Sequence, residues 1–259
     1  MKIDFLLIGA HKCGTNALRH YIEFHPNVIS REHAPIHFFD ENYTFGASWY
    51  LQKFNFVEKI KYRDHKLYEL TASYIYHPDC PKRIYEYNPD MKLILLVRDP
   101  VKRAFSDWMM HRNYELNNHP VYPHERREFV TAFSESAVCL LDYFDSRTLY
   151  FHVGKYSIHI RNYLKYFSFS QILVIEDVEL KTQPVLVMDK VSDFLNLKKI
   201  DWTLFNYEAQ NVNDYHGYVL SEDVYLRLCS FYDLYNRDLC NLLQRSFTWA
   251  GEKHEFNTL

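Results

Sequence analysis

The sequence has 259 residues, of which 47% are hydrophobic and 17% aromatic, so it can build one domain with a substantial core. The formal net charge is -3 at pH 7, which argues against broad electrostatic binding of a nucleic acid polymer. This charge balance does not exclude a local basic pocket.

The odd number of cysteines, five, argues against a complete disulfide framework, and the lack of a close CxxC pair argues against a zinc site. The apolar run near the N-terminus is too short for a signal peptide, and no stretch approaches the roughly 18 apolar residues of a membrane span. These features predict a cytoplasmic protein without a membrane span, and they leave its oligomeric state open.

The first informative stretch covers residues 5–20. Residues 5–8 are predicted to form a buried strand, residues 9–14 a glycine-bounded loop, and helical spacing begins at Thr15. This order directs backbone N–H groups and a helix dipole at an anion. In the usual nucleotide-binding loop a Lys follows the second Gly directly, whereas here Lys12 lies within the loop. A strand-to-helix turn without a ligand remains the alternative.

The stretch 31–40 combines titratable groups with apolar residues, as the wall of a site would. Its candidate general bases are Glu32, His33 and His37, although each one could instead be a surface residue. An aromatic-rich helix is predicted for residues 43–56. A strand is predicted for residues 67–76.

The second informative stretch covers residues 92–111. Residues 93–97 form an uninterrupted apolar run, typical of a buried parallel strand, and a helix is predicted from Pro100. Arg98 and Ser106 could converge at the carboxyl end of this strand, where ligands bind in open α/β sheets. An Arg and a hydroxyl suit a bound phosphate, but a salt-bridged Arg and a helix-surface Ser are equally compatible with the pattern.

The remainder of the chain continues the alternation of strands and helices. Residues 112–150 are less regular and are interpreted as an insertion that carries substrate contacts or as a surface excursion. A buried strand is predicted at 171–175, and helices are predicted at 185–195 and 221–243. This alternation predicts an α/β fold with a parallel sheet wrapped by helices.

Two of these motifs, in the expected order, resemble the sulfotransferase family that uses 3′-phosphoadenosine-5′-phosphosulfate (PAPS). The closest pattern is the branch of bacterial and heparan sulfate N- and 3-O-sulfotransferases. Lys-Cys-Gly-Thr at 12–15 is similar to the loop for the 5′-phosphosulfate, and Leu-Leu-Val-Arg-Asp-Pro-Val-Lys-Arg-Ala-Phe-Ser at 95–106 is similar to the 3′-phosphate motif. The resemblance implies one sulfotransferase domain over 1–259, with a P-loop-like three-layer fold and a central, mainly parallel sheet.

The resemblance also implies residues for PAPS, for its product PAP and for the acceptor. The expected cofactor contacts are Lys12, Cys13, Gly14, Thr15, Asn16, Ala17, Arg98, Ser106, Tyr156, Asn211 and Asn213. The expected acceptor contacts are His37, Phe38, Glu69, Thr71, Tyr74 and Trp108. Lys12 is expected to be catalytic as well, because its charge faces the charge that builds on the departing phosphate. No metal is required, since cationic side chains and helix N-termini would neutralise the phosphates.

The sequence departs from the family pattern at the general base. The family often has a Glu three residues before its Phe-Phe pair, and here that position is Pro35. Glu32 is favoured as the base, with His33 and His37 as the alternatives.

The basic nucleotide loop of the heparan sulfate enzymes is also replaced, by Asn211-Val212-Asn213. Fewer cations than in those enzymes and a negative net charge favour a small neutral or cationic acceptor, such as a natural product, a sugar or an alkaloid, over a glycosaminoglycan. Two further alternatives are an ATP/Mg²⁺ phosphotransferase, with Glu176 and Asp177 as metal ligands, and a non-catalytic nucleotide-binding protein.

Overall fold

The computed structural model describes residues 2–29, 35–54, 64–117, 120, 124–138, 150–207 and 217–250. The chain forms two compact units, one from residues 1–97 with 161–211 and the other from residues 98–160 with 212–259. Each unit is thus assembled from two separate stretches of chain, and the organisation as a single domain over 1–259 stays a prediction.

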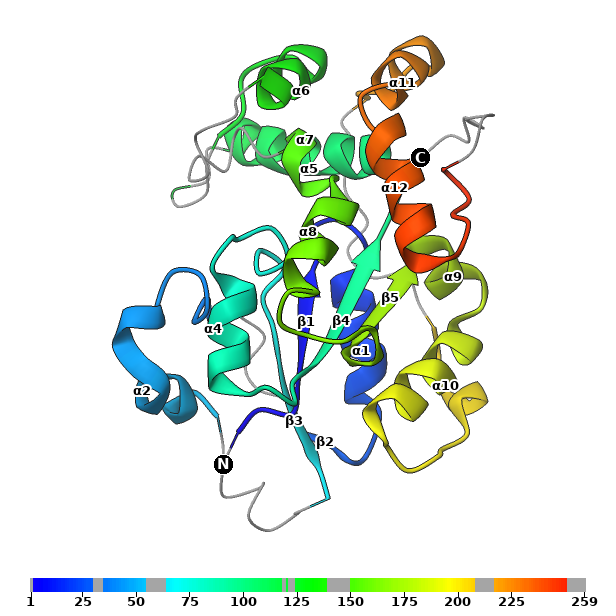
Figure 1. Ribbon diagram of the computed structural model, residues 1–259. Helices are drawn as coiled ribbons and strands as arrows, with labels where there is room; N and C mark the ends of the chain where they lie inside the picture. The colour runs from blue at the N-terminus through cyan, green and yellow to red at the C-terminus, as the bar shows by residue number, and fades with distance from the viewer. Residues whose placement is uncertain are drawn as a thin grey trace. The chain divides into compact units, whose positions relative to one another are not determined.

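The first unit contains a five-stranded sheet in which every pair of neighbours is parallel, in the order β2-β3-β1-β4-β5 (Figure 1). The strands are β1 (Phe5–Gly9), β2 (Val28–Ile29), β3 (Lys66–Leu70), β4 (Lys92–Val97) and β5 (Ile172–Glu176). In β4 every residue after Lys92 is buried, as an apolar run covered on both faces requires. This sheet confirms the predicted α/β fold class.

Helices flank the sheet of the first unit (Figure 1). They are α1 (Thr15–Glu23), α2 (Gly46–Gln52), α4 (Cys80–Tyr87), α9 (Asp177–Thr182) and α10 (Pro184–Leu195), with 3-10 turns at Tyr43–Phe45, Phe169–Gln171 and Trp202–Leu204. A proline lies in the first turn of both α4 and α10, where its missing N–H has no intrahelical partner to lose.

The second unit is helical in its described part. Its helices are α5 (Pro100–Leu116), α6 (Phe129–Val138), α7 (Tyr150–Val153), α11 (Glu222–Cys229) and α12 (Asp233–Leu243). Helix α8 (Tyr156–Tyr163) begins in the second unit and ends in the first, because the division falls between Ile160 and Arg161. Its core is aromatic, with Trp108, Phe133 and Tyr232 almost fully buried. Gly154 permits close packing here, because a Cβ at this position would lie 2.8 Å from both Pro100 and Tyr232.

Three predicted elements differ in extent from the observed ones. The strand expected at 67–76 ends at Leu70, and the backbone then turns, with the N–H of Tyr74 bonded to the carbonyl of Thr71. The helix expected at 43–56 is a 3-10 turn followed by the seven-residue α2. The helix expected at 221–243 is two helices, because tighter i to i−3 bonds from Phe231 and Tyr232 end α11.

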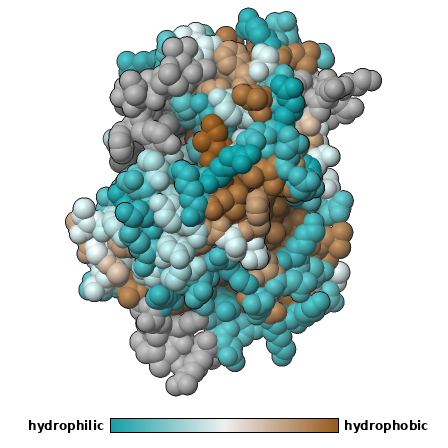
Figure 2. All heavy atoms as spheres, in the orientation of Figure 1, coloured by the Kyte–Doolittle hydropathy of each residue, from teal (hydrophilic) through white to brown (hydrophobic). Residues whose placement is uncertain are grey.

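The described residues contain no helix that is both long enough and apolar enough to cross a membrane. The face drawn in Figure 2 is largely hydrophilic, with hydrophobic residues also reaching the surface. Apolar atoms contribute a large part of the surface of any folded protein, so this exposure by itself indicates no site.

Candidate active site

The loop between β1 and α1 begins the candidate site of the first unit. The backbone N–H of Ala10 donates to the carbonyl of Leu96 on β4, so the loop starts fixed to the sheet. Gly14 has φ 91 and Lys12 has φ 67, both in the left-handed region that favours glycine. A Lys held in this conformation is unusual, and it is the same loop residue that the sequence singled out.

The amino end of α1 follows this loop directly. Gly14 occupies the N-cap position, the first turn contains no acidic residue, and no side chain of the described residues caps the helix. The backbone N–H groups of Thr15, Asn16 and Ala17 have no intrahelical acceptor, because they belong to the first turn. The amino end of the nine-residue helix α1, with Lys12 just before it, suits an anionic phosphosulfate. Gly14 has no side chain, so the backbone can approach such an anion closely.

Arg98 follows the last residue of β4 and belongs to the second unit. Its backbone is bound at both ends by one hydroxyl: the N–H of Arg98 donates to Tyr156 at 3.4 Å, and that hydroxyl donates to the carbonyl of Arg98 at 3.0 Å. Tyr156 is almost fully buried, at 1% exposure. The structure therefore brings these two predicted residues together, with Tyr156 fixing the main chain at Arg98.

The helix that carries Ser106 is capped by the residue after Arg98. Asp99 accepts from the N–H groups of Val101 and Lys102 at 2.9 and 3.0 Å and from the Tyr225 hydroxyl at 2.5 Å. Burial raises the pKa of Asp99, and these hydrogen bonds partly offset that effect. Ser106 lies on the same helix and is buried, at 3% exposure.

Trp108 packs in the core of the second unit. Its ring is 5.3 Å from that of Tyr218, and its indole N–H donates to the carbonyl of Arg127 at 2.9 Å. This packing favours a role in the core, and the predicted contact of Trp108 with the acceptor stays a prediction.

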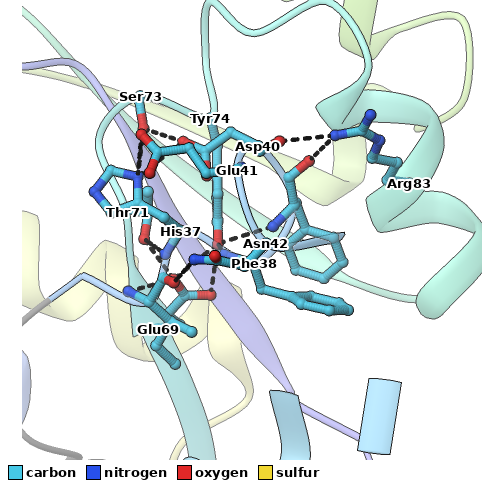
Figure 3. Close-up of polar contacts among 12 residues, drawn as sticks. His37, Phe38, Asp40, Glu41, Asn42, Glu69, Thr71, Ser73, Tyr74 and Arg83 are labelled. Atoms are coloured by element: carbon cyan, nitrogen blue, oxygen red, sulfur yellow. Dashed lines mark hydrogen bonds and ion pairs between the residues drawn. The ribbon is translucent and has the colours of Figure 1, made fainter. Parts of the chain in front are cut away.

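A histidine–aspartate pair lies in the turn after residue 35 (Figure 3). The Nδ1 atom of His37 is 3.0 Å from the Oδ2 atom of Asp40, and the Ser73 hydroxyl donates to the same oxygen at 2.5 Å. The side chain of Asp40 is 3% exposed, whereas that of His37 is 30% exposed. The carboxylate therefore lies behind the imidazole, which keeps part of its surface accessible.

The pair shifts both pKa values. Burial by itself lowers the pKa of His37, but the hydrogen bond to Asp40 and the negative charges of Asp40, Glu41 and Glu69 raise it above its usual value. For Asp40, burial raises the pKa, but hydrogen bonds from His37 and Ser73 lower it below its usual range. A neutral imidazole that a carboxylate orients, and whose pKa it raises, is suited to accept a proton.

A second carboxylate, Glu69, is buried beneath this turn at 4% exposure (Figure 3). It accepts hydrogen bonds from the hydroxyls of Tyr50 and Thr71, at 2.6 Å for Tyr50, and from Tyr74 at 2.9 Å. Burial raises the pKa of Glu69, and these donors partly offset the effect.

Several of the predicted acceptor contacts are interior residues. Phe38 and Tyr74 are 1% and 0% exposed, and Thr71 is 0% exposed. The structure brings them together with Glu69 and His37, in positions that favour support of the turn. Their contact with the acceptor, like that of Glu69, stays a prediction.

Other predicted residues lie outside the described part of the chain. They are Glu32, His33, Asn211 and Asn213. Cys13 is described: it is fully buried, and its thiol points to the carbonyl of His11 at 3.7 Å.

No role was predicted for Asp40 or Ser73 from the sequence. The spacing of three residues between His37 and Asp40 within one turn could have indicated the pair. Ser73 carries no such signal, because only the turn after β3 brings it to Asp40.

One group of potential metal ligands occurs among the described residues. Single atoms of His37, Asp40 and Glu41 lie within 4.8 Å of one another. Nδ1 of His37 lies 3.7 Å from the Glu41 carboxylate and is also the atom that bonds to Asp40. A metal ion bound to Nδ1 would therefore displace the proton of the His37–Asp40 hydrogen bond.

Comparison with known proteins finds matches along most of the chain. The family model of the sulfotransferase domain matches residues 2–230. Heparan sulfate glucosamine 3-O-sulfotransferase 6 from mouse is 34% identical over 197 residues, which are 75% of this chain and 52% of that protein. The bifunctional heparan sulfate N-deacetylase/N-sulfotransferase 4 from mouse is 32% identical over 199 residues, or 74% of this chain and 22% of that protein. The chain thus spans about half, or less, of these relatives.

Solved structures show the same fold. A sulfotransferase from Alicyclobacillus acidocaldarius has a TM-score of 0.75 at 23% identity and covers 96% of this chain and 98% of its own. The mouse sulfotransferase SULT7A1, complexed with PAP, has a TM-score of 0.60 at 16% identity and covers 94% of this chain and 87% of its own.

Proposed function

This chain belongs to the sulfotransferase domain family, and we propose that it transfers a sulfuryl group from PAPS to a hydroxyl or amine of a small acceptor, with His37 as general base. The observation that carries the proposal is the His37–Asp40 pair, which lies in the turn where Pro35 occupies the position of the usual family Glu. The predicted preference for Glu32 as the base is replaced by His37 in this proposal, because its geometry supports the role.

The residues of the β1–α1 loop provide the donor end of the proposed site. PAPS, when bound, supplies the sulfuryl group in activated form. The Lys12 ammonium and the N–H groups of Thr15, Asn16 and Ala17 would bind the 5′ end, where one preorganised donor contributes about 3–4 kcal/mol to the rate. On the second unit, Arg98 and Ser106 would bind the 3′-phosphate, with the Arg98 main chain held by Tyr156.

His37 would remove the proton from the acceptor. Asp40 holds the Nδ1–H tautomer of the imidazole, so Nε2 carries the lone pair that receives the acceptor proton. The resulting imidazolium is stabilised by the buried Asp40 carboxylate. General base catalysis of this kind contributes roughly 10²–10⁴-fold to the rate.

The surroundings of His37 support an acceptor that is neutral or cationic. Glu41 is 71% exposed in its side chain and its carboxylate lies 3.7 Å from His37, so it would repel a polyanionic chain. Aromatic rings follow in the same segment: Phe45 is 59% exposed and its ring lies 5.0 Å from that of Trp49. Such rings suit a flat or cationic acceptor through stacking or cation–π contact.

A turnover assay tests this function. Purified protein is incubated with PAPS and either a panel of phenols, amines and simple sugars or a desulfated heparan chain, and PAP release is measured. We expect release with members of the small-molecule panel and little with the chain. Release that only the chain stimulates would favour a glycosaminoglycan acceptor.

Two further arms of the same assay address the remaining alternatives. PAP release that is unchanged in excess chelator is expected here. An ATP/Mg²⁺ phosphotransferase would instead release ADP when ATP replaces PAPS, and excess chelator would abolish that release. No release with any acceptor, despite binding of PAP in calorimetry, would favour a non-catalytic nucleotide-binding protein.

A further inference from the structure

We propose that Glu69 is a positioning residue that fixes the turn at residues 36–39 and thereby aims the ring of His37. This inference rests on the proposed function, in which His37 is the base. Glu69 lies on β3 and does not contact the imidazole through a hydrogen bond, so its influence passes through the backbone of the turn.

Four successive backbone N–H groups end on Glu69 or on a hydroxyl bonded to it (Figure 3). The N–H of Ile36 donates to Oε1 of Glu69 at 3.3 Å. The N–H of His37 donates to the Thr71 hydroxyl at 3.4 Å. The N–H groups of Phe38 and Phe39 donate to the Tyr74 hydroxyl at 2.8 and 3.2 Å.

The direction of these bonds follows from the number of protons. Thr71 and Tyr74 each carry one hydroxyl proton, and both donate it to Glu69, so only their lone pairs remain for the N–H groups of the turn. Tyr50 and the N–H of Ile36 also donate to the carboxylate. An ionised carboxylate can accept all four donors, whereas an amide in its place would direct two N–H groups at groups that already donate.

The turn needs this external support because His37 has φ 53. That left-handed conformation is costly for a residue with a Cβ, and it persists only where surrounding bonds determine it. On its other side, the His37 carbonyl accepts from the N–H groups of Asn42 at 2.8 Å and Glu41 at 3.2 Å. The peptide groups on both sides of His37 are therefore bonded, and Glu69 orders the side that faces the sheet.

Burial makes this arrangement sensitive to substitution. Glu69, Thr71 and Tyr74 are 4%, 0% and 0% exposed, so water does not readily replace a lost acceptor. No Lys or Arg among the described residues forms an ion pair with Glu69, and its charge is balanced by hydrogen bonds alone. The same charge also helps to raise the pKa of His37.

Two tyrosines provide a matched pair of variants. Tyr50→Phe and Tyr74→Phe each remove one buried hydroxyl that donates to Glu69, but only Tyr74 also accepts from the turn. We expect Tyr74→Phe to lower kcat about 10-fold or more, because two N–H groups lose their acceptor, and Tyr50→Phe to lower it less than about 3-fold. Glu69→Gln should resemble Tyr74→Phe, and KM for PAPS should change little in all three.

Thr71 offers a second comparison that is less disruptive. Thr71→Val removes the hydroxyl at nearly constant volume, whereas Thr71→Ser retains it. The proposal expects kcat to fall about 5-fold or more in Thr71→Val and to stay near the wild-type value in Thr71→Ser. Calorimetric binding of PAP and circular dichroism establish that each variant is folded.

The decisive measurement does not require turnover. The imidazole resonances of His37 are followed by NMR against pH, and we expect Tyr74→Phe and Glu69→Gln to lower the pKa of His37 while Tyr50→Phe leaves it nearly unchanged. Equal effects of Tyr50→Phe and Tyr74→Phe on both kcat and this titration would overturn the proposal. If wild-type protein forms no PAP but the titration still distinguishes the two tyrosines, positioning is supported and sulfuryl transfer is refuted.

Discussion

Replacement of Asp40 by Asn tests the proposed base most directly. The 3.0 Å contact between Nδ1 of His37 and Oδ2 of Asp40 is a hydrogen bond to a charged group that is 3% exposed, a class that contributes about 1.5–3 kcal/mol. Since about 1.4 kcal/mol changes a rate tenfold, kcat of Asp40→Asn should fall roughly 10- to 100-fold at the plateau. The fold should survive, because Arg83 bonds to the backbone carbonyls of Phe39 and Asp40.

The pH dependence of kcat should shift in a direction that the pKa of His37 determines. The neutral imidazole is the active base, so the rate rises as pH increases through the pKa of His37 and then levels off. Asp40 raises this pKa, and its loss must lower it, so the acidic limb of Asp40→Asn should move to lower pH. An acidic limb that stays in place or moves to higher pH would refute the assignment of His37 as the base.

Glu41→Gln is the matched control, since it removes the same charge beside the same ring. Its carboxylate lies 3.7 Å from Nδ1, makes no hydrogen bond to it, and is 71% exposed. Exposed ion pairs contribute about 0–1 kcal/mol, so kcat should fall less than about 5-fold. A loss equal to that of Asp40→Asn would mean that net charge, and not the buried hydrogen bond, controls the rate.

Three further substitutions test other parts of the molecule. Lys12→Met should lower kcat about 10²–10³-fold, measured at saturating PAPS, because a donor aimed at developing charge is lost; an unchanged kcat would exclude this role. Arg98→Ala should weaken PAP binding roughly 10- to 100-fold in calorimetry but leave the affinity for adenosine 5′-phosphate, which lacks the 3′-phosphate, nearly constant; equal losses would refute the assignment. Gly154→Ala should lower the midpoint of thermal unfolding by roughly 2–12 °C, since the added methyl meets Pro100 and Tyr232 at 2.8 Å; an unchanged midpoint would show that the neighbours shift freely.

The parallel sheet was predictable because its signals are local. Residues 93–97 form an apolar run that is typical of a strand covered on both faces, and the structure places β4 at Lys92–Val97. The glycine-bounded loop was predictable for the same reason: Gly14 marks a positive φ, and α1 starts at the next residue.

The histidine–aspartate pair needed tertiary information. Titratable residues at 31–40 indicated a site wall, but the choice among Glu32, His33 and His37 depends on which side chain has a buried partner. Asp40 accepts a hydrogen bond from Ser73, which is 33 positions away in the sequence. Ser73 comes near only because the chain turns after Leu70. Periodicity predicted a longer strand in that region, and a pattern of period two does not reveal where backbone hydrogen bonding to a neighbour stops.

The two hydrogen bonds that join the Tyr156 hydroxyl to Arg98 involve the two peptide groups on either side of the Arg98 Cα. The identity of the residue at position 98 can therefore change while the path of the main chain is retained. In evolutionary terms this uncouples two properties that often conflict, namely foldability and ligand choice. With Arg98 in its proposed role, a single substitution at this position would change the anion that is bound while the main chain keeps its path.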